Sequence, residues 1–155
     1  MPTIEELNEQ VIAFLRQDEL DYPAAAAKFG AAVLPLLKAL IEGNDENLAI
    51  KAAYLAGYIK HDSVAEIINS AASNKFTAVR VAAAYGSQKL SAADASKVLD
   101  KSLDDVDPGV LKVAIRSVES LNIAKNFKAK LGNIGKVQLD LNVKGFANDL
   151  IKKIK

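Results

Sequence analysis

Few residues in this chain of 155 amino acids are of types that carry out chemistry, and the first to consider are His61 and Asp62. An imidazole beside a carboxylate can bind a metal ion or transfer a proton. A metal site needs several converging ligands, however, and the chain has no cysteine and no second histidine to supply them. We therefore expect His61 and Asp62 to be turn residues.

Two other stretches match ligand-binding motifs only in part. Asp104, Asp105 and Asp107 place three carboxylates close together, but they lack the spacing and the glycine of a calcium-binding loop. Capping of the helix that follows explains them better. The stretch GNIGK at residues 132–136 lacks the earlier glycine and the following hydroxyl residue of a phosphate-binding loop. The sequence thus predicts no catalytic residue, no metal site and no cofactor.

The elements that must position any functional side chain are helices. Proline and glycine are sparse and mostly separate segments in which apolar residues recur at helical spacing. Helix-start signals agree: a hydroxyl is followed three residues later by an acid at Thr3 and Glu6, Ser63 and Glu66, and Ser91 and Asp94, and Asp107 precedes Pro108. The length suits one domain with its own core. The sequence predicts a single all-α domain.

Composition also indicates a compartment. Without cysteine there is no disulfide, which favours the cytosol slightly. The start, MPTIEELNEQ, carries acids where a signal peptide would carry positive charge, and no segment approaches about 18 uninterrupted apolar residues. We expect a cytoplasmic protein with no membrane span.

Three blocks of the chain superimpose when the sequence is shifted by 31 residues. Corresponding positions in the first halves are Val33, Leu37 and Ile41, then Val64, Ile68 and Ala72, then Ala95, Leu99 and Leu103; in the second halves they are Leu48, Ala52 and Ile59, then Val79, Ala83 and Leu90, then Val110, Ala114 and Leu121. Each block predicts two amphipathic helices joined by a turn. Because one pair cannot bury its apolar faces alone, the pairs must stack.

Two of these segments carry a family resemblance. VRVAAAYGSQKL (79–90) and DPGVLKVAIRSVESL (107–121) resemble the second helix of HEAT repeats, in the short, alanine-rich form of the phycobilisome-lyase-like group. The resemblance covers about residues 22–121. It implies a right-handed α-α superhelix whose second helices line a concave face, and a role as a binding scaffold.

The flanks lose the period and are interpreted as caps, which keep the stacking faces of terminal repeats from solvent. The predicted organisation is an N-terminal cap at residues 1–30 with helices at 4–17 and 22–30, three repeats at 31–121, and a basic C-terminal cap at 122–155 with a helix at 142–155. Apolar residues alternate strictly over 137–143, which predicts an extended segment before the last helix.

Helical spacing further predicts which side chains of the second helices point away from the first helices. The predicted partner-binding residues of the concave face are Ile50, Tyr54, Val81, Tyr85, Gln88, Lys112, Ile115, Arg116 and Glu119. Among them Tyr54, Tyr85 and Arg116 form a ladder of residue types that are enriched at binding hot spots. The alternative is that neighbouring helices, or the C-terminal segment, cover much of this face.

Charge is distributed unevenly along the chain. Residues 1–121 carry 17 acids and 12 basic residues, whereas residues 122–155 carry eight lysines and two aspartates. The predicted basic patch consists of Lys125, Lys128, Lys130, Lys136, Lys144, Lys152 and Lys153. It indicates either a capping helix with a solvated lysine face or a surface for an acidic partner, a nucleic-acid backbone or an anionic membrane.

Three classes of function follow. We favour a non-catalytic scaffold or adaptor that binds a partner protein on the concave face, with an inhibitor or immunity-type protein as a variant. The second class is a nucleic-acid or acidic-surface binder that uses the lysines. An enzyme similar to the bilin lyases or DNA glycosylases of this repeat class is least favoured, because the chain has no cysteine, tryptophan or histidine pair.

Overall fold

The computed structural model describes residues 2–154, which form helices and turns and contain no strand. The α-helices are α1 (Ile4–Leu15), α2 (Tyr22–Phe29), α3 (Leu34–Glu42), α4 (Glu46–Tyr58), α5 (Val64–Ala71), α6 (Thr77–Gly86), α7 (Ala92–Ser102), α8 (Pro108–Ser120), α9 (Lys128–Val137) and α10 (Leu141–Lys153). Short 3-10 turns lie at η1 (Gly30–Val33), η2 (Ser87–Lys89) and η3 (Ala124–Phe127). The predicted all-α fold is confirmed.

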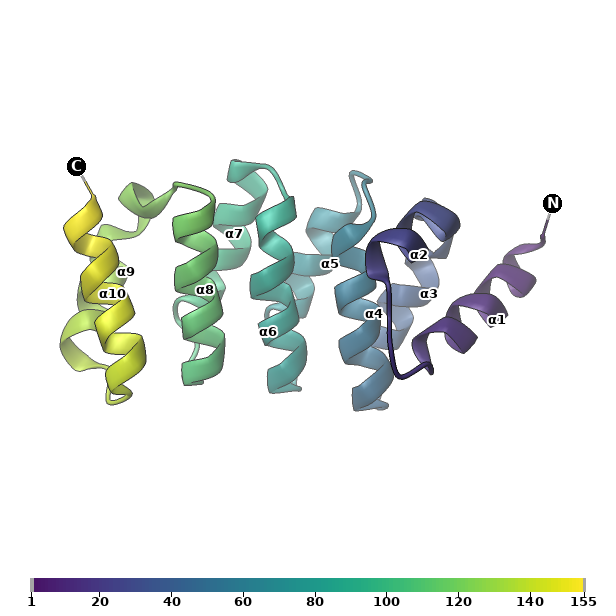
Figure 1. Cartoon of the computed structure of the whole chain (residues 1–155), viewed down its shortest axis with the longest axis horizontal. Helices are drawn as coiled ribbons and strands as arrows, with labels where there is room; N and C mark the ends of the chain where they lie inside the picture. The colour runs from purple at the N-terminus through teal and green to yellow at the C-terminus, as the bar shows by residue number, and fades with distance from the viewer. Residues whose placement is uncertain (1, 155) are drawn as a thin grey trace.

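The helices stack as pairs in two layers (Figure 1). One layer contains the first helices α3, α5, α7 and α9, and the other contains the second helices α4, α6, α8 and α10. Neighbouring second helices contact each other more extensively than neighbouring first helices do. Glycines allow α4 and α6 to approach closely, because a Cβ atom on Gly57 would lie 3.4 Å from the Cα atom of Gly86 on the next second helix. We call the outward surface of α4, α6, α8 and α10 the second-helix face.

Most of the predicted helix starts have the expected caps. The side chains of Thr3, Ser91 and Asp107 accept hydrogen bonds from the backbone N–H groups three residues ahead, at 3.1, 3.2 and 3.0 Å. Ser63 is the exception, because its side chain makes no capping bond. Its hydroxyl Oγ lies 2.8 Å from Nδ1 of His61 instead. The capping role predicted for Ser63 is therefore wrong.

The apolar core runs between the two layers. Leu37, Leu55, Ile68, Leu99 and Leu111 are among its largest fully buried side chains. They lie on α3, α4, α5, α7 and α8 and therefore come from both layers. The apolar core of each helix pair is completed by side chains of the next pair.

The extended segment predicted over residues 137–143 is wrong. Helix α9 ends at Val137 and α10 begins at Leu141, so this segment is the turn of a fourth helix pair. The backbone N–H of Asp140 donates to the Gln138 side chain at 3.2 Å. The turn before α8 has the matching bond, from the Asp107 N–H to the Asp105 carboxylate at 3.0 Å. The alternation arises because Gln138, Asp140 and Asn142 separate apolar residues across a turn between two helices. The stretch GNIGK lies within α9.

Residues Tyr22–Glu42 form a segment that is long and apolar enough, by length and composition, to cross a membrane. The same properties are found in the core helices of globular proteins. In the structure the segment is divided, because the backbone φ of Gly30 is +64° and η1 separates α2 from α3. Phe29, Val33 and Leu37 of this segment are buried in the protein core.

Candidate functional site

All four tyrosines of the chain come together at the α2, α4 and α6 end of the second-helix face. The ring of Tyr22 is stacked on that of Tyr58, with centroids 6.1 Å apart and an interplanar angle of 2°. Tyr54 lies between its neighbours, 5.8 Å from Tyr22 and 6.0 Å from Tyr85. These separations are typical of favourable aromatic pairs. Each tyrosine is only partly buried, so the rings form a packed aromatic surface.

A lysine completes this arrangement. The ammonium Nζ of Lys89, in η2, lies 4.2 Å from the ring centroid of Tyr58 and 4.4 Å from that of Tyr85. The hydroxyl oxygens of Tyr58 and Tyr85 are 3.3 Å apart and share a hydrogen bond. We call Tyr22, Tyr54, Tyr58, Tyr85 and Lys89 the tyrosine cluster. Its rings are held by one another and by the cation above them, so little side-chain freedom remains to be lost on binding.

The contacts within the cluster shift tyrosine pKa values in opposite directions. The hydrogen bond with Tyr85 raises the pKa of Tyr58 to about 12. The same bond, together with the positive charge of Lys89, lowers the pKa of Tyr85. Burial raises the pKa of both Tyr22 and Tyr54. Tyr85 is therefore the first of the four expected to ionise as the pH rises.

This order of ionisation can be measured directly, because the chain has four tyrosines and no tryptophan to obscure tyrosinate absorbance. We expect one tyrosine to titrate below the ordinary pKa of 10.0 and three above it. Lys89→Met should move the early transition to higher pH, because the cation that stabilises the Tyr85 phenolate is gone. Lys38→Met, on the first-helix layer, is the control and should leave the titration unchanged. An early transition at the same pH in Lys89→Met as in the wild-type protein would contradict this geometry.

A hollow of about 660 Å³ borders the tyrosine cluster. Tyr58 and Lys89 form its edge on the side of the cluster, and the turns after α4 and α6 supply most of the remaining lining. His61 lies in this lining with its side chain exposed, as its predicted turn position requires. Within residues 2–154 no group of three or more histidine, aspartate or glutamate side chains is arranged to hold a metal ion.

The structure places most of the predicted partner-binding residues on the second-helix face, with one clear error. Ile115 is only 3% exposed and belongs to the core shared with α9 and α10. Ala84 and Ala53, which lie one and two repeats earlier at the same position, are fully buried as well. This position faces the neighbouring second helix. Spacing within one helix locates the side opposite the first helix, but it does not show how closely the next repeat packs.

The other predicted residues differ in their solvent exposure and in whether they already have a hydrogen-bond or ion-pair partner. Ile50, Tyr54, Val81, Tyr85, Gln88 and Lys112 are partly buried, and Arg116 and Glu119 are exposed. The Gln88 side chain already donates to the Ser117 hydroxyl at 2.9 Å, and Glu119 pairs with Lys153 at 3.0 Å. Arg116 therefore remains the most accessible cation of the predicted face.

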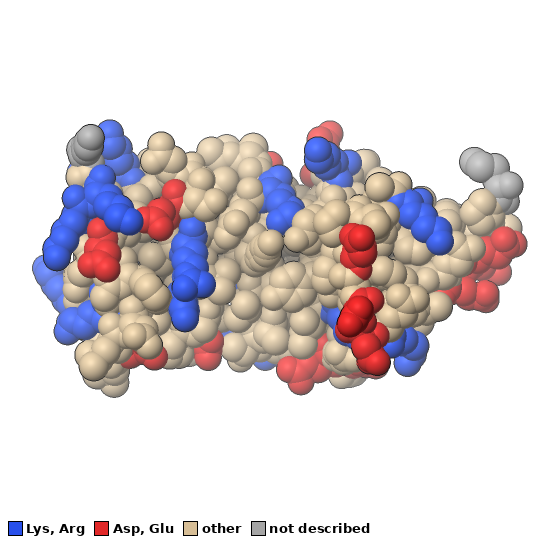
Figure 2. Space-filling view, in the orientation of Figure 1, with Lys and Arg blue, Asp and Glu red and all other residues tan. Residues whose placement is uncertain are grey.

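The predicted ladder of Tyr54, Tyr85 and Arg116 is divided into two parts. The two tyrosines belong to the tyrosine cluster, whereas the Arg116 guanidinium lies 5.4 Å from the ring centroid of Phe146 on α10. Lys112 lies 5.5 Å from the same ring. Basic side chains gather toward the α8 and α10 end of this face, and acidic ones lie at the α1 end (Figure 2).

Sequence reasoning missed several members of the site. Tyr58 follows Tyr54 by four residues and therefore shares its side of the helix, a signal that helical spacing provides. Lys89 follows Tyr85 by four residues, although a 3-10 turn intervenes. Tyr22 and Phe146 come from flanks outside the period, and nothing in their local sequence indicates their contacts.

Two lysines of the predicted basic patch form ion pairs with acidic residues of the same chain. Lys130 forms ion pairs with Asp100 at 2.9 Å and with Asp104 at 2.7 Å. Burial alone would lower the pKa of Lys130, but its hydrogen bonds with Asp104 and Asp100 raise it overall. Lys153 pairs with Glu119. Lys125, Lys128, Lys136, Lys144 and Lys152 form no ion pair with any other residue in the range 2–154.

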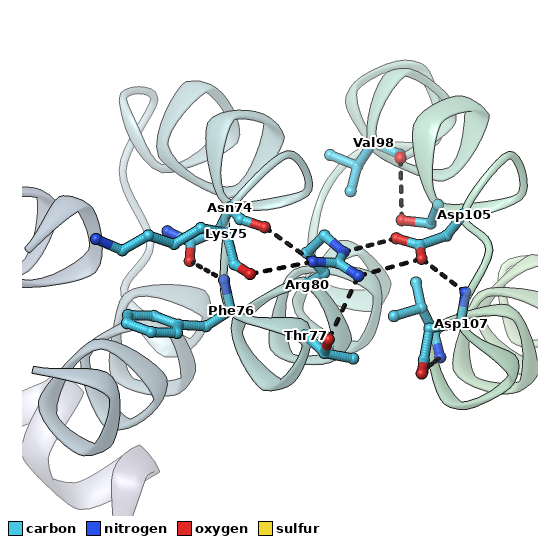
Figure 3. A network of polar contacts seen from close by, with 10 residues as sticks. Asn74, Lys75, Phe76, Thr77, Arg80, Val98, Asp105 and Asp107 are labelled. Atoms are coloured by element: carbon cyan, nitrogen blue, oxygen red, sulfur yellow. Dashed lines mark hydrogen bonds and ion pairs between the residues drawn. The ribbon is translucent and has the colours of Figure 1, made fainter. Parts of the chain in front are cut away.

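A polar network on the opposite edge from the hollow fixes the spacing of successive pairs (Figure 3). Arg80 at the start of α6 is central to it, and its Nε donates to the Asp105 carboxylate at 2.8 Å. The Arg80 Nη1 donates to the backbone carbonyl of Asn74 at 3.1 Å. The guanidinium thus ties the turn before α6 to the turn before α8.

Stacked helix pairs with a shared core define an α-solenoid, a class of repeat proteins whose extended faces are used for binding. The HEAT repeats family matches residues 33–119, from η1 through nearly all of α8. This match spans more than half of the chain, which therefore belongs to the HEAT-repeat family. HEAT repeats are commonly protein-interaction scaffolds and are typically non-enzymatic. The phycobilisome-lyase-like subtype stays a prediction. The curated proteins contain no match to the chain.

Proposed function

We propose that this protein is a non-catalytic scaffold or adaptor that binds a partner protein through the second-helix face, with the tyrosine cluster as the centre of the interface. The observation that carries the proposal is the assembly of all four tyrosines and Lys89 into one partly exposed, ordered surface. Tyrosine supplies a large contact area with a hydroxyl for hydrogen bonding, and it is enriched at binding hot spots.

Three further features support this role. The middle of the second-helix face is largely uncharged, so a partner can cover it without desolvating many ions (Figure 2). The hollow beside Tyr58 and Lys89 can accept a protruding side chain of the partner. Arg116 and Lys112 extend the contact toward α10 and favour a partner with acidic groups at that end. The cysteine-free composition supports a cytoplasmic setting for this interaction.

The proposal is tested with the double variant Tyr54→Ala/Tyr85→Ala. Both side chains are partly exposed, so we expect the variant to remain helical and folded, with a modest loss of stability from the lost ring contacts. We expect a partner captured by the wild-type protein from a lysate of the native host to be lost by the variant.

The matched control is Lys38→Ala/Lys97→Ala, which alters two exposed side chains on the first-helix layer and should retain the partner. Circular dichroism and thermal unfolding check the fold of both variants. A folded tyrosine variant that captures the same partner as well as the wild type does would refute the proposal. Unfolding of the variant would show that the tyrosines serve the core instead.

A further inference from the structure

Three large apolar side chains are exposed to solvent at the turn between α9 and α10. Val137 is 64% exposed, Leu139 92% and Leu141 80%. Only Ile4 and Val106 join them as exposed large hydrophobic residues in the described part of the chain. Side chains of this size are ordinarily buried, and a group of three within five residues marks an interaction site.

The same edge of the array carries one more exposed apolar side chain. Val106 is 89% exposed and lies in the turn before α8, between Asp105 and Asp107. Leu139 has the corresponding place in the turn before α10, between Gln138 and Asp140. Because the two turns share their hydrogen bonding and repeat with the helix pairs, they project from the same edge of the solenoid.

The helices on either side of this apolar turn supply positive charge. Lys136 directly precedes Val137, and Lys144 follows Leu141 by three residues. Lys128 and Lys152 also have no ion-pair partner in residues 2–154, but they lie at the opposite ends of α9 and α10 from this turn. In Figure 2 the blue side chains of this end of the molecule lie mostly toward the C-terminal end of α10 rather than at the lower edge.

The acids near this edge are held within the chain. Asp104 pairs with Lys130 and Asp105 pairs with Arg80. The carboxylates of Asp107 and Asp140 accept bonds from backbone N–H groups at the starts of α8 and α10. These contacts offset part of the negative charge locally, whereas the unpaired lysines remain available to an external anion.

We propose that the α9–α10 pair docks on an anionic membrane surface. Val137, Leu139 and Leu141 enter the interface between headgroups and acyl chains, and Lys136 and Lys144 beside the turn contact lipid phosphates and carboxylates. A nucleic-acid backbone satisfies the lysines but gives no partner to the three apolar side chains. The membrane interface is fluid, so it can accommodate a projecting apolar turn and needs no preformed pocket. This docking leaves the tyrosine cluster free and does not depend on the function proposed above.

The probe is a set of vesicles, one of phosphatidylcholine alone and one that also contains about 30% phosphatidylserine. Full-length wild-type protein should float with the phosphatidylserine vesicles, should bind phosphatidylcholine vesicles much more weakly, and should dissociate as salt concentration rises. Leu139→Ser/Leu141→Ser should weaken vesicle binding by at least about tenfold. Because both side chains are exposed, thermal unfolding of this variant should match that of the wild type.

Ile4→Ser is the matched control, since it removes an exposed apolar side chain from the other end of the array and should leave vesicle binding unchanged. Lys136→Ser/Lys144→Ser should weaken binding to the phosphatidylserine vesicles. The proposal is overturned if wild-type protein does not bind these vesicles, or if Leu139→Ser/Leu141→Ser binds them equally well. It is also overturned if the leucine substitutions instead abolish a dimer seen by analytical ultracentrifugation.

Discussion

Asp105→Ala is expected to lower the free energy of unfolding by about 3 kcal/mol, because it leaves the largely buried Arg80 guanidinium without its carboxylate. The side chains of Arg80 and Asp105 are only 19% and 8% exposed, so water replaces the lost partner poorly. The substitution also removes the acceptor for the Asp107 N–H in the turn before α8. The measurement is chemical unfolding followed by circular dichroism.

The neighbouring residue provides the control for this prediction. Asp104 also forms an ion pair, with Lys130, but its side chain is 66% exposed. Asp104→Ala should therefore cost less than about 1 kcal/mol, as is usual for surface pairs. Equal losses of stability from the two substitutions would show that the Arg80 network does not fix the spacing of the repeats.

Ile115→Ala is the second substitution with a large expected effect, a loss of about 3 kcal/mol from a fully packed site between second helices. Arg116→Ala, one residue further along α8, should cost less than about 1 kcal/mol because that side chain is exposed and lies over the face of the Phe146 ring. Unfolding curves of the two variants make the comparison. A larger effect at Arg116 than at Ile115 would mean that α8 is rotated relative to the structure described above.

The period of 31 residues predicts most of the architecture, because it determines where each helix pair begins and which side chains meet within it. Val110 and Ala114 are buried as their spacing requires, and Leu121 is partly buried. The first helix of the fourth pair escaped prediction, since the turn after it contains three apolar residues at alternating positions and the pair has lost the repeat pattern. The sequence does predict the second helix, α10, at residues 142–155. Local pattern cannot distinguish a short strand from a turn with exposed apolar residues.

The candidate site could be predicted only in part for a related reason. Tyr54 and Tyr85 occupy equivalent positions in successive repeats, so the period places them side by side. Tyr22 joins them from α2, and its position depends on how the N-terminal helices pack against α4. The contact of Arg116 with Phe146 likewise depends on the docking of α10 against α8. Contacts between non-repeating flanks and the repeats are tertiary, and sequence periodicity carries no information about them.

The central claim is that the tyrosine cluster is the energetic centre of a protein interface, and the dissociation constant of the captured partner tests it most directly. With purified components, we predict that Tyr54→Ala/Tyr85→Ala raises this constant by at least about 100-fold, which corresponds to the loss of one or two hot-spot side chains. Lys38→Ala/Lys97→Ala should leave it within about threefold of the wild-type value. A folded tyrosine variant with a wild-type dissociation constant would contradict the claim.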